Sequence, residues 1–234
     1  MQKKGVSSSI WLRKPGVGRY YPRSKVEVTG FWAKYYDVLL DIITLNKYRN
    51  FIKEVIRFMQ IKREDRILDL GCGTGRNTCL MRNYLSNRGS IIGVDISEIM
   101  IKQFKKKCSI FTNVYAVYSR ADRTLPFKGN LFDKILISFM IHGFPHNVRE
   151  SILDEARRVL KNRGRLFILD YNKFEFGTLP FYIKLPFKYM ECIYAFDFIR
   201  RDWLKILSDK GFAYSKQRLF FSDYIRILEA YRSN

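Results

Sequence analysis

The chain has 234 residues, of which 47% are hydrophobic and 16% are aromatic. This apolar content is enough to fill the core of one α/β domain and excludes a globally disordered chain. The 43 lysine and arginine residues outnumber the 22 acidic residues, which gives a formal net charge of +21. Such a surface attracts anions, so nucleic acid, anionic lipid headgroups and acidic small molecules are open as partners.

The cysteines and histidines argue against a metal site. Cys72, Cys79, Cys108 and Cys192 form no C-x-x-C pair, and the chain has only two histidines, so a structural zinc site is disfavoured and we expect no metal. We find no signal-peptide pattern and no apolar run of membrane-spanning length. We therefore expect reduced cysteines in a cytoplasmic protein that is soluble or peripheral at a membrane.

The first expected elements are an arm and a helical segment. Residues 1–30 carry seven lysines and arginines against the single acid Glu27, and we expect them to form a basic arm ahead of one domain over 31–234. Residues 31–61 show a helical pattern. Its apolar side chains recur at three- and four-residue steps: Tyr48, Phe51, Ile52, Val55, Ile56 and Met59.

Strands and helices then alternate. We expect strands at 66–70, 90–94, 114–117, 132–140 and 165–170, and helices at 76–87, 97–107 and 147–160. Ser97 is the expected cap of the second of these helices, and Asn147 with Glu150 resembles a capping box for the third. Arg163 and Gly164 would turn the chain into the fifth strand. This alternation indicates right-handed βαβ units and a mainly parallel sheet.

The alternation breaks after Asp170. Residues 172–200 are rich in aromatic side chains, with lysines and arginines between them, and we expect an insertion that covers the active site. Such a composition suits an apolar acceptor, a membrane interface with anionic headgroups, or stacking on single-stranded nucleic acid. A hydrophobic lid packed on the core is an equally good interpretation. A helix capped by Asp202 and ended by Gly211 should follow, and then antiparallel edge strands at 212–221 and 224–228.

The strongest motif is the run Leu-Asp-Leu-Gly-Cys-Gly-Thr-Gly at residues 68–75. A strand runs into three glycines at alternate positions, where the backbone can turn sharply and approach a ligand closely, and a helix N-terminus follows. The spacing is neither that of a dinucleotide-binding G-x-G-x-x-G turn nor that of a P-loop. Asp95 ends the next strand, where its carboxylate could accept hydrogen bonds from both hydroxyls of a ribose.

Further along, Ala121-Asp122, Leu-Pro-Phe at 125–127, Phe132-Asp133 and Arg-Val-Leu-Lys at 158–161 complete a recognisable set. Over residues 31–170 this set resembles the class I S-adenosylmethionine-dependent methyltransferases, in the branch of the ubiquinone/menaquinone C-methyltransferases. The resemblance implies a Rossmann-like, doubly wound sheet of seven mostly parallel strands with a reversed final hairpin. It also implies S-adenosylmethionine as cofactor and a site for it at Tyr36, Asp69, Gly71, Cys72, Gly73, Gly75, Asn77, Asp95, Ile96, Ala121, Asp122 and Ser138.

In the family the glycines pass under the methionine part of the cofactor. By resemblance Asp95 would hold the ribose and Asp122 the adenine amino group, with Ala121 beside it. Tyr36-Asp37 resembles the pair that opens the branch's N-terminal helix, where the tyrosine often reaches the cofactor.

A base is needed only if the acceptor must lose a proton to become nucleophilic. His142, just past the fourth strand, is the first candidate and His146 the second, although both could be structural histidines. Asp170 and Tyr171 could line the acceptor pocket or form a buried pair. The fourth strand carries no Asn/Asp-Pro-Pro-Tyr/Phe sequence, which disfavours adenine-N6 and glutamine amide acceptors.

Two functions follow. The first is methyl transfer to a small, lipophilic acceptor such as a quinone precursor or a lipid headgroup. The second is an RNA methyltransferase, or a basic nucleic-acid-binding protein with the same fold. The net charge favours nucleic acid, whereas the family branch favours the small acceptor; the oligomeric state stays open.

Overall fold

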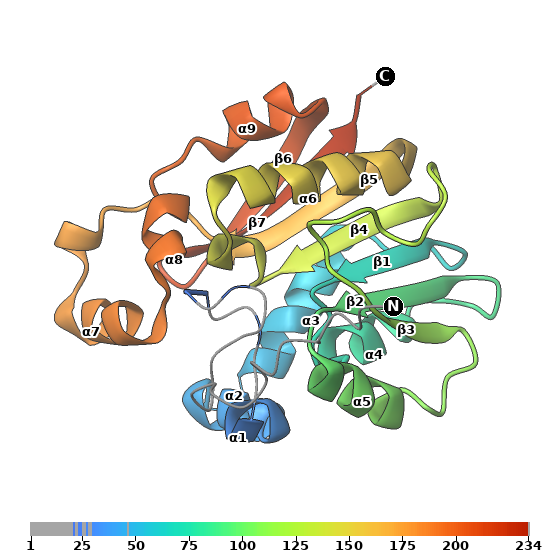
Figure 1. The fold of residues 1–234 in the computed structure, drawn as a ribbon, viewed down its shortest axis with the longest axis horizontal. Helices are drawn as coiled ribbons and strands as arrows, with labels where there is room; N and C mark the ends of the chain where they lie inside the picture. The colour runs from blue at the N-terminus through green and yellow to red at the C-terminus, as the bar shows by residue number, and fades with distance from the viewer. Residues whose placement is uncertain (1–20, 22, 25–26, 28–29, 46, 234) are drawn as a thin grey trace, which may run out of the picture.

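The computed structural model describes residues 21, 23, 24, 27, 30–45 and 47–233 (Figure 1). The predicted arm at residues 1–30 therefore lies mostly outside the described residues. None of the helices within the described residues is long and apolar enough to cross a membrane.

Seven strands form one sheet in the order β3-β2-β1-β4-β5-β7-β6 (Figure 1). The pairs β3–β2, β2–β1, β1–β4 and β4–β5 are parallel, whereas β7 runs antiparallel to both β5 and β6. The predicted parallel sheet with a reversed final hairpin is thus confirmed. The strands are β1 (Arg66–Leu70), β2 (Ser90–Asp95), β3 (Val114–Tyr118), β4 (Phe132–Ser138), β5 (Leu160–Tyr171), β6 (Phe212–Phe220) and β7 (Ile225–Arg232).

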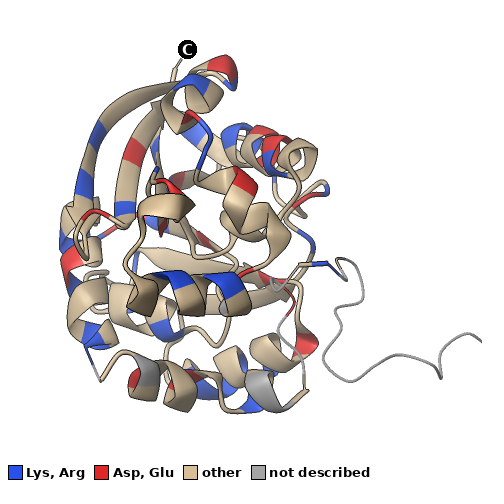
Figure 2. Cartoon of the chain, turned by 90° about the vertical axis from the view of Figure 1, so that its left-hand side faces the viewer, with Lys and Arg blue, Asp and Glu red and all other residues tan. Residues whose placement is uncertain are grey.

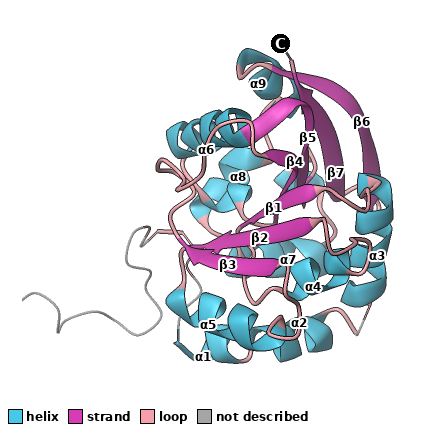
Figure 3. Ribbon diagram, turned by 90° about the vertical axis from the view of Figure 1, so that its right-hand side faces the viewer, coloured by secondary structure: helices cyan, strands magenta, loops and turns pink. Residues whose placement is uncertain are grey.

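Helices cover both faces of the sheet (Figure 3). One face packs against α3 (Tyr48–Met59), α4 (Arg76–Arg82) and α5 (Glu98–Lys107). The other face packs against α6 (His146–Val159), α8 (Ile193–Phe198) and α9 (Trp203–Asp209). The remaining elements are α1 (Gly30–Lys34), α2 (Tyr36–Ile43), α7 (Phe181–Met190) and the 3₁₀ turns η1 (Ile141–Gly143) and η2 (Phe176–Thr178).

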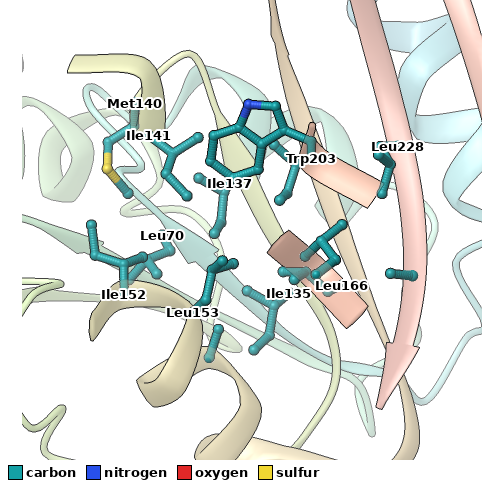
Figure 4. Close-up of a cluster of buried hydrophobic side chains, with 14 of the residues drawn as sticks. Leu70, Ile135, Ile137, Met140, Ile141, Ile152, Leu153, Leu166, Trp203 and Leu228 are labelled. Atoms are coloured by element: carbon teal, nitrogen blue, oxygen red, sulfur yellow. The ribbon is translucent and has the colours of Figure 1, made fainter. Parts of the chain in front are cut away.

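The sequence of β1 shows how the two cores arise. Successive side chains of a strand point to opposite faces, so Ile67 joins the cluster under α3 while Leu68 and Leu70 join the cluster under α6. Figure 4 shows this second cluster, in which α6 presents Ile152 and Leu153 to the sheet. Strands buried on both faces explain the nearly continuous apolar runs in the sequence.

Two of the three predicted helix caps are confirmed. The hydroxyl of Ser97 accepts a hydrogen bond from the backbone of α5, and the carboxylate of Asp202 accepts two from α9. The capping box at Asn147 is wrong: α6 begins one residue earlier, at His146, and its N-cap is Pro145, which makes no side-chain cap. The rigid φ of proline sets the entry into this helix instead.

Other differences concern chain breaks. The helical stretch predicted at 31–61 is divided into α1, α2 and α3, and Leu45, just after α2, has a left-handed φ of 49°. Arg163 and Gly164 do not precede the fifth strand but lie within β5, where the register to β4 shifts. Arg163 absorbs that irregularity with a φ of 59°.

The expectation of reduced cysteines is wrong for one pair. Cys79 of α4 and Cys108, which follows α5, form a disulfide with their Cα atoms 6.2 Å apart. The packing of α4 beside α5 brings together two residues that are 29 positions apart. A disulfide between them cannot be predicted from the spacing of the cysteines in the sequence. Cys72 and Cys192 are free and buried.

Candidate functional site

The glycine turn after β1 begins the site. Gly71, Gly73 and Gly75 have φ values of 81°, 52° and 79°, a region that side chains avoid. A Cβ atom on Gly71 would lie 2.7 Å from Met140 and one on Gly75 would lie 2.6 Å from Phe104. A Cβ on Gly73 would meet nothing within 4 Å, so its backbone borders open space where a ligand can approach.

Asp95, at the end of β2, is held against this turn. Its Oδ2 accepts a hydrogen bond from the backbone N–H of Gly73 and its Oδ1 accepts one from Ser97, both at 2.8 Å. Burial raises the pKa of the carboxyl to about 6, although these backbone donors act in the opposite direction. The carboxylate is therefore fixed in place and can accept further hydrogen bonds, as a ribose diol requires.

Asp69 lies in β1 just before the turn. Its surroundings indicate whether the methionine part of the cofactor would fit here. Its side chain is fully buried, and its Oδ2 accepts a hydrogen bond from Thr78 at 2.5 Å. Among the described residues, its Oδ1 is buried without a hydrogen-bond partner. Burial raises the pKa of this carboxyl to about 7. An ammonium group satisfies such an orphaned acceptor, so the residue fits the amino group of the cofactor.

A pocket beside the glycine turn collects the ends of β1 to β4. It includes five of the predicted cofactor residues, Gly71, Asp95, Ile96, Ala121 and Asp122. Its other walls were not predicted from the sequence, although each lies at or beyond the carboxyl end of a parallel strand, where ligands bind in such sheets. The full lining is Gly71, Val94, Asp95, Ile96, Ser119, Ala121, Asp122, Met140 and Phe144.

Asp122 is engaged by an arginine. Its two oxygens accept hydrogen bonds from Arg120 at 3.0 and 2.7 Å. Burial acts to raise the pKa of this carboxyl, but the hydrogen bonds from Arg120 and Tyr21 lower it overall. An adenine amino group would therefore share this carboxylate with the Arg120 guanidinium.

Tyr21, which precedes α1, packs beside the same end of the pocket, a contact that the sequence did not predict. The ring of Tyr21 meets Phe144 edge-on at 4.9 Å, and its hydroxyl accepts a hydrogen bond from Arg120 at 3.2 Å. Burial and a hydrogen bond with Asp122 raise the pKa of the Tyr21 phenol to about 12. The hydroxyl of Ser24 donates to a backbone carbonyl of η1 at 2.5 Å. These contacts place Tyr21 against the wall where adenine is expected.

Three predicted side chains lie at the other end of the glycine turn. The amide of Asn77 donates to the Ser138 hydroxyl and accepts from the Tyr48 hydroxyl, both at 3.2 Å. Burial raises the pKa of Tyr36, and the charges of Asp37 and Asp95 add to this effect. The Tyr36 side chain thus lies within reach of the charge of Asp95, the carboxylate expected to hold the ribose.

Helix α2 is tied to the turn by charged side chains. Thr74 donates to Asp37 at 2.8 Å, and Lys107 forms an ion pair with the same carboxylate. Arg76 forms an ion pair with Asp41 one turn further along α2. These contacts fix the helix whose first residue is Tyr36.

Cys72 contributes no side chain to the pocket. Its sulfur packs against Gly93 and the core under α5, and its backbone N–H donates to Val94 at 3.0 Å. Burial raises the pKa of its thiol well above the usual value. Cys72 therefore shapes the turn from below.

Beyond the turn, four side chains form what we term the polar cluster: His142, Asp170, Tyr171 and Glu191. His142 lies between two carboxylates, with Nδ1 2.7 Å from Asp170 and Nε2 3.3 Å from Glu191. The Tyr171 hydroxyl donates to Glu191 at 2.7 Å. Burial acts to lower the pKa of His142, but the two carboxylates raise it to about 10. His142 is therefore an imidazolium at neutral pH in this arrangement.

Arg149 of α6, which is fully buried, holds this part of the site together. Its guanidinium donates to the carbonyls of Ile141 and His142 in η1 and of Tyr194 in α8, at 3.2, 3.1 and 2.6 Å. It also forms an ion pair with Asp197 at 2.6 Å. The arginine thus joins the turn that carries His142 to the insertion.

His146, the second candidate base, opens α6. Burial lowers its pKa, and so does the charge of Arg201. The negative charges that raise its pKa are those of Glu150 and Asp197, and not those of the polar cluster.

Known proteins share this architecture. A methyltransferase from Aquifex aeolicus described as dependent on S-adenosylmethionine superposes with a TM-score of 0.61 at 21% identity, over 77% of this chain and 88% of its own. The magnesium protoporphyrin IX methyltransferase of Synechocystis, solved with bound S-adenosylhomocysteine, superposes with a TM-score of 0.60 at 18% identity, over 80% of this chain and 84% of its own. Both show the same fold.

Sequence comparison is more specific. The demethylmenaquinone methyltransferase of Staphylococcus saprophyticus is 31% identical over 177 residues, which are 73% of each chain. That of Staphylococcus carnosus is 31% identical over 192 residues, covering 74% of this chain and 77% of the relative. Residues 24–195 match the ubiE/COQ5 methyltransferase family. This chain therefore belongs to the ubiE/COQ5 family and is a methyltransferase that uses S-adenosylmethionine as its cofactor.

Proposed function

We propose that this enzyme methylates a quinol, an aromatic ring that carries a hydroxyl group and an apolar tail. The observation that carries the proposal is the polar cluster, which lies at the carboxyl edge of the sheet beside the cofactor turn and is enclosed by aromatic rings. The Tyr36 hydroxyl connects the two places, since the charges of both Asp95 and Glu191 act on its pKa. The names of the demethylmenaquinone methyltransferases among its relatives support the same class of acceptor.

The walls of this region suit a flat ring. Tyr171 lies 5.1 Å from Phe187 and 6.4 Å from Phe174, and the ring of Phe198 lies 6.3 Å from His142, all edge-on. Aromatic side chains bind an aromatic acceptor by edge and face contacts. A few polar groups within an apolar wall then fix its orientation.

The cofactor supplies the methyl group, and the protein must remove the acceptor's hydroxyl proton. His142 already carries a proton at neutral pH, so we assign proton acceptance to the carboxylate of Glu191. The O–H bond would break, the proton would move to Glu191, and the electron pair would enrich the ring carbon. That carbon would take the methyl group from the sulfonium of the cofactor, whose S–CH₃ bond would break to leave S-adenosylhomocysteine. That carbon then loses its own proton to water. His142, expected from the sequence as the base, becomes a positioning residue that stabilises the Glu191 charge.

The insertion at 172–200 would cover the bound acceptor. It supplies Glu191 to the cluster and several of its aromatic neighbours, and it belongs with the single domain over 31–234 that we propose. Closure of such a cover excludes water and aligns the acceptor with the methyl group.

The test is methylation of a defined panel with labelled cofactor. Demethylmenaquinol with a short prenyl tail should gain one methyl group, detected by mass, while menaquinol, already methylated, should not react. Single-stranded RNA, the substrate of the alternative function, should remain unlabelled. Labelling of RNA, or of neither quinol, would contradict the proposal; the match to the small-molecule family favours the quinol.

A further inference from the structure

Helix α7 exposes an unusual amount of apolar surface. Phe181 is 79% exposed, Tyr182 65%, Leu185 57% and Tyr189 69%. Tyr182, Leu185 and Tyr189 recur at three- and four-residue steps, so they lie along one face of the helix. Exposed apolar side chains are ordinarily scattered, and a contiguous group marks an interaction surface.

This face is held outward by an anchor on the other side of the helix. Phe187 is buried and packs 5.1 Å from both Tyr171 and Phe196 and 5.6 Å from Phe174. In Figure 1, α7 lies at the edge of the molecule, away from the sheet. The helix therefore buries the ring of Phe187, while Phe181, Tyr182, Leu185 and Tyr189 remain exposed.

The charges on α7 are of one sign. The helix contains Lys184 and Lys188 and no acidic residue. Figure 2 shows the molecule from the side on which α7 lies in Figure 1, with lysines and arginines in blue. The Lys184 ammonium lies over the ring of Phe176 and that of Lys188 over the ring of Tyr189, at 5.5 and 5.8 Å. Lysines that border an apolar helix face are typical of helices lying in the interface of an anionic bilayer.

We propose that α7 docks this enzyme on an anionic phospholipid bilayer. The docking surface is Phe181, Tyr182, Leu185 and Tyr189, which enter the acyl boundary, with Lys184 and Lys188, which meet the headgroups. Charge complementarity selects this occupant, because the net charge of +21 attracts an anionic surface and α7 offers nothing to repel it.

If the proposed function is correct, the position of α7 explains how membrane docking would assist catalysis. Glu191 follows the last residue of α7 directly and reaches His142 at 3.3 Å. A docked helix therefore holds the polar cluster close to the bilayer. An acceptor with an apolar tail could present its ring to the cluster while the tail stays in lipid.

Vesicle flotation of the full chain tests the docking. The chain should float with vesicles of phosphatidylglycerol and phosphatidylcholine and less with phosphatidylcholine alone. Phe181→Ser with Leu185→Ser should reduce the bound fraction roughly tenfold or more, because two large apolar side chains no longer enter the bilayer. Lys184→Glu with Lys188→Glu should weaken the preference for anionic vesicles, because α7 would then present acidic side chains to the headgroups.

The matched control replaces apolar side chains at the other edge of the sheet. Ile110 is 79% exposed and Tyr115 54%, and Ile110→Ser with Tyr115→Ser should float as the parent does. Unchanged binding of S-adenosylhomocysteine would verify that each variant is folded. Equal flotation of the α7 variants and the parent would overturn the proposal, and so would an equal loss in the control. Binding of single-stranded RNA that is lost in the α7 variants, without vesicle binding, would identify a nucleic-acid surface instead.

The outcome is separable from the proposed function. If the chain floats through α7 but methylates no quinol, the docking proposal holds and the quinol proposal fails. If the chain methylates short-tailed quinol in solution but does not float, the quinol proposal holds and the docking proposal fails.

Discussion

The cofactor half of the site and the proposed acceptor half are built by different means. Around the cofactor, short turns after β1, β2 and β3 present backbone groups and a few acidic residues, such as Asp95 bonded to the amide of Gly73. The acceptor half depends on side chains from distant segments, such as His142 between Asp170 and Glu191. Strand ends bring the first set together wherever the sheet forms, whereas the second set needs its own tertiary contacts. The two halves should therefore fail separately.

Removing the Arg149 clamp should have the largest effect. Arg149→Met removes a buried donor from three backbone carbonyls and one of the two arginines that pair with Asp197, which keeps Arg201. Breaking a buried ion pair costs about 3–5 kcal/mol. We expect a loss near the lower figure in the free energy of unfolding by urea, because Asp197 itself is half-exposed. At urea concentrations below the unfolding midpoint of the variant, S-adenosylhomocysteine should still bind.

The control is Arg88→Met, whose ion pair to Glu64 is exposed and should be worth at most about 1 kcal/mol. Equal destabilisation by both variants would show that Arg149 has no special role. A loss of cofactor binding in parallel with stability would show that the two halves are one unit.

This difference also explains what the sequence could predict. Asp95 ends a strand, and Gly71 and Ala121 each follow one within a few residues, so a linear motif reveals them. Arg149 meets Tyr194 and Asp197 across 45 and 48 residues, and Glu191 meets His142 from an insertion without a motif. No periodicity encodes such pairs, because they depend on how α8 packs against η1.

The same limit applied near the cofactor. Tyr21 reaches Arg120 across 99 residues, and the sequence before α1 offered only composition. The pairing of Cys79 with Cys108 likewise depended on the packing of two helices. Contacts between residues far apart in the sequence, away from the strand ends, are visible only in the folded chain.

Glu191→Gln should affect turnover and spare the cofactor. The amide keeps the size of the side chain but accepts no proton, and general-base contributions begin at about 100-fold. We expect kcat with demethylmenaquinol to fall about 100-fold, while the affinity for S-adenosylhomocysteine measured by calorimetry stays the same. Glu175→Gln, an exposed position in the same insertion, should match the parent. An unaltered kcat would place the proton acceptor elsewhere.

Asp95→Asn should instead weaken cofactor binding. The amide presents an N–H group where the ribose hydroxyls need an acceptor, and loss of a charged hydrogen-bond partner costs about 1.5–3 kcal/mol. The dissociation constant for S-adenosylhomocysteine should rise by roughly 10- to 150-fold, and the unfolding midpoint should change little. Asp209→Asn, an exposed residue of α9, is the control. If Asp95→Asn bound as tightly as the parent, the ribose would lie elsewhere.

The smallest effect expected is a dependence of cofactor affinity on pH that only the cofactor half produces. Burial raises the pKa of Asp69 to about 7 and that of Asp95 to about 6. Ligand binding needs both carboxylates charged, so affinity should fall from about pH 7 downward and more steeply below about pH 6, by up to about tenfold per pH unit for each proton. His142, with a pKa of about 10, stays charged throughout this range.

The stability of the ligand-free protein should change in the opposite direction. Both folded-state pKa values are raised above the unfolded value of about 3.9, so the stability these groups contribute is full below that pH and is lost as pH rises through about 6 and about 7. Acidification from about pH 8 to about pH 5 should therefore offset part of the usual acid destabilisation while it weakens binding. Calorimetry should show that Asp69→Asn removes the upper step in affinity and Asp95→Asn the lower one. If both variants kept the parent's pH profile, the two carboxylates would not be the groups that the cofactor contacts.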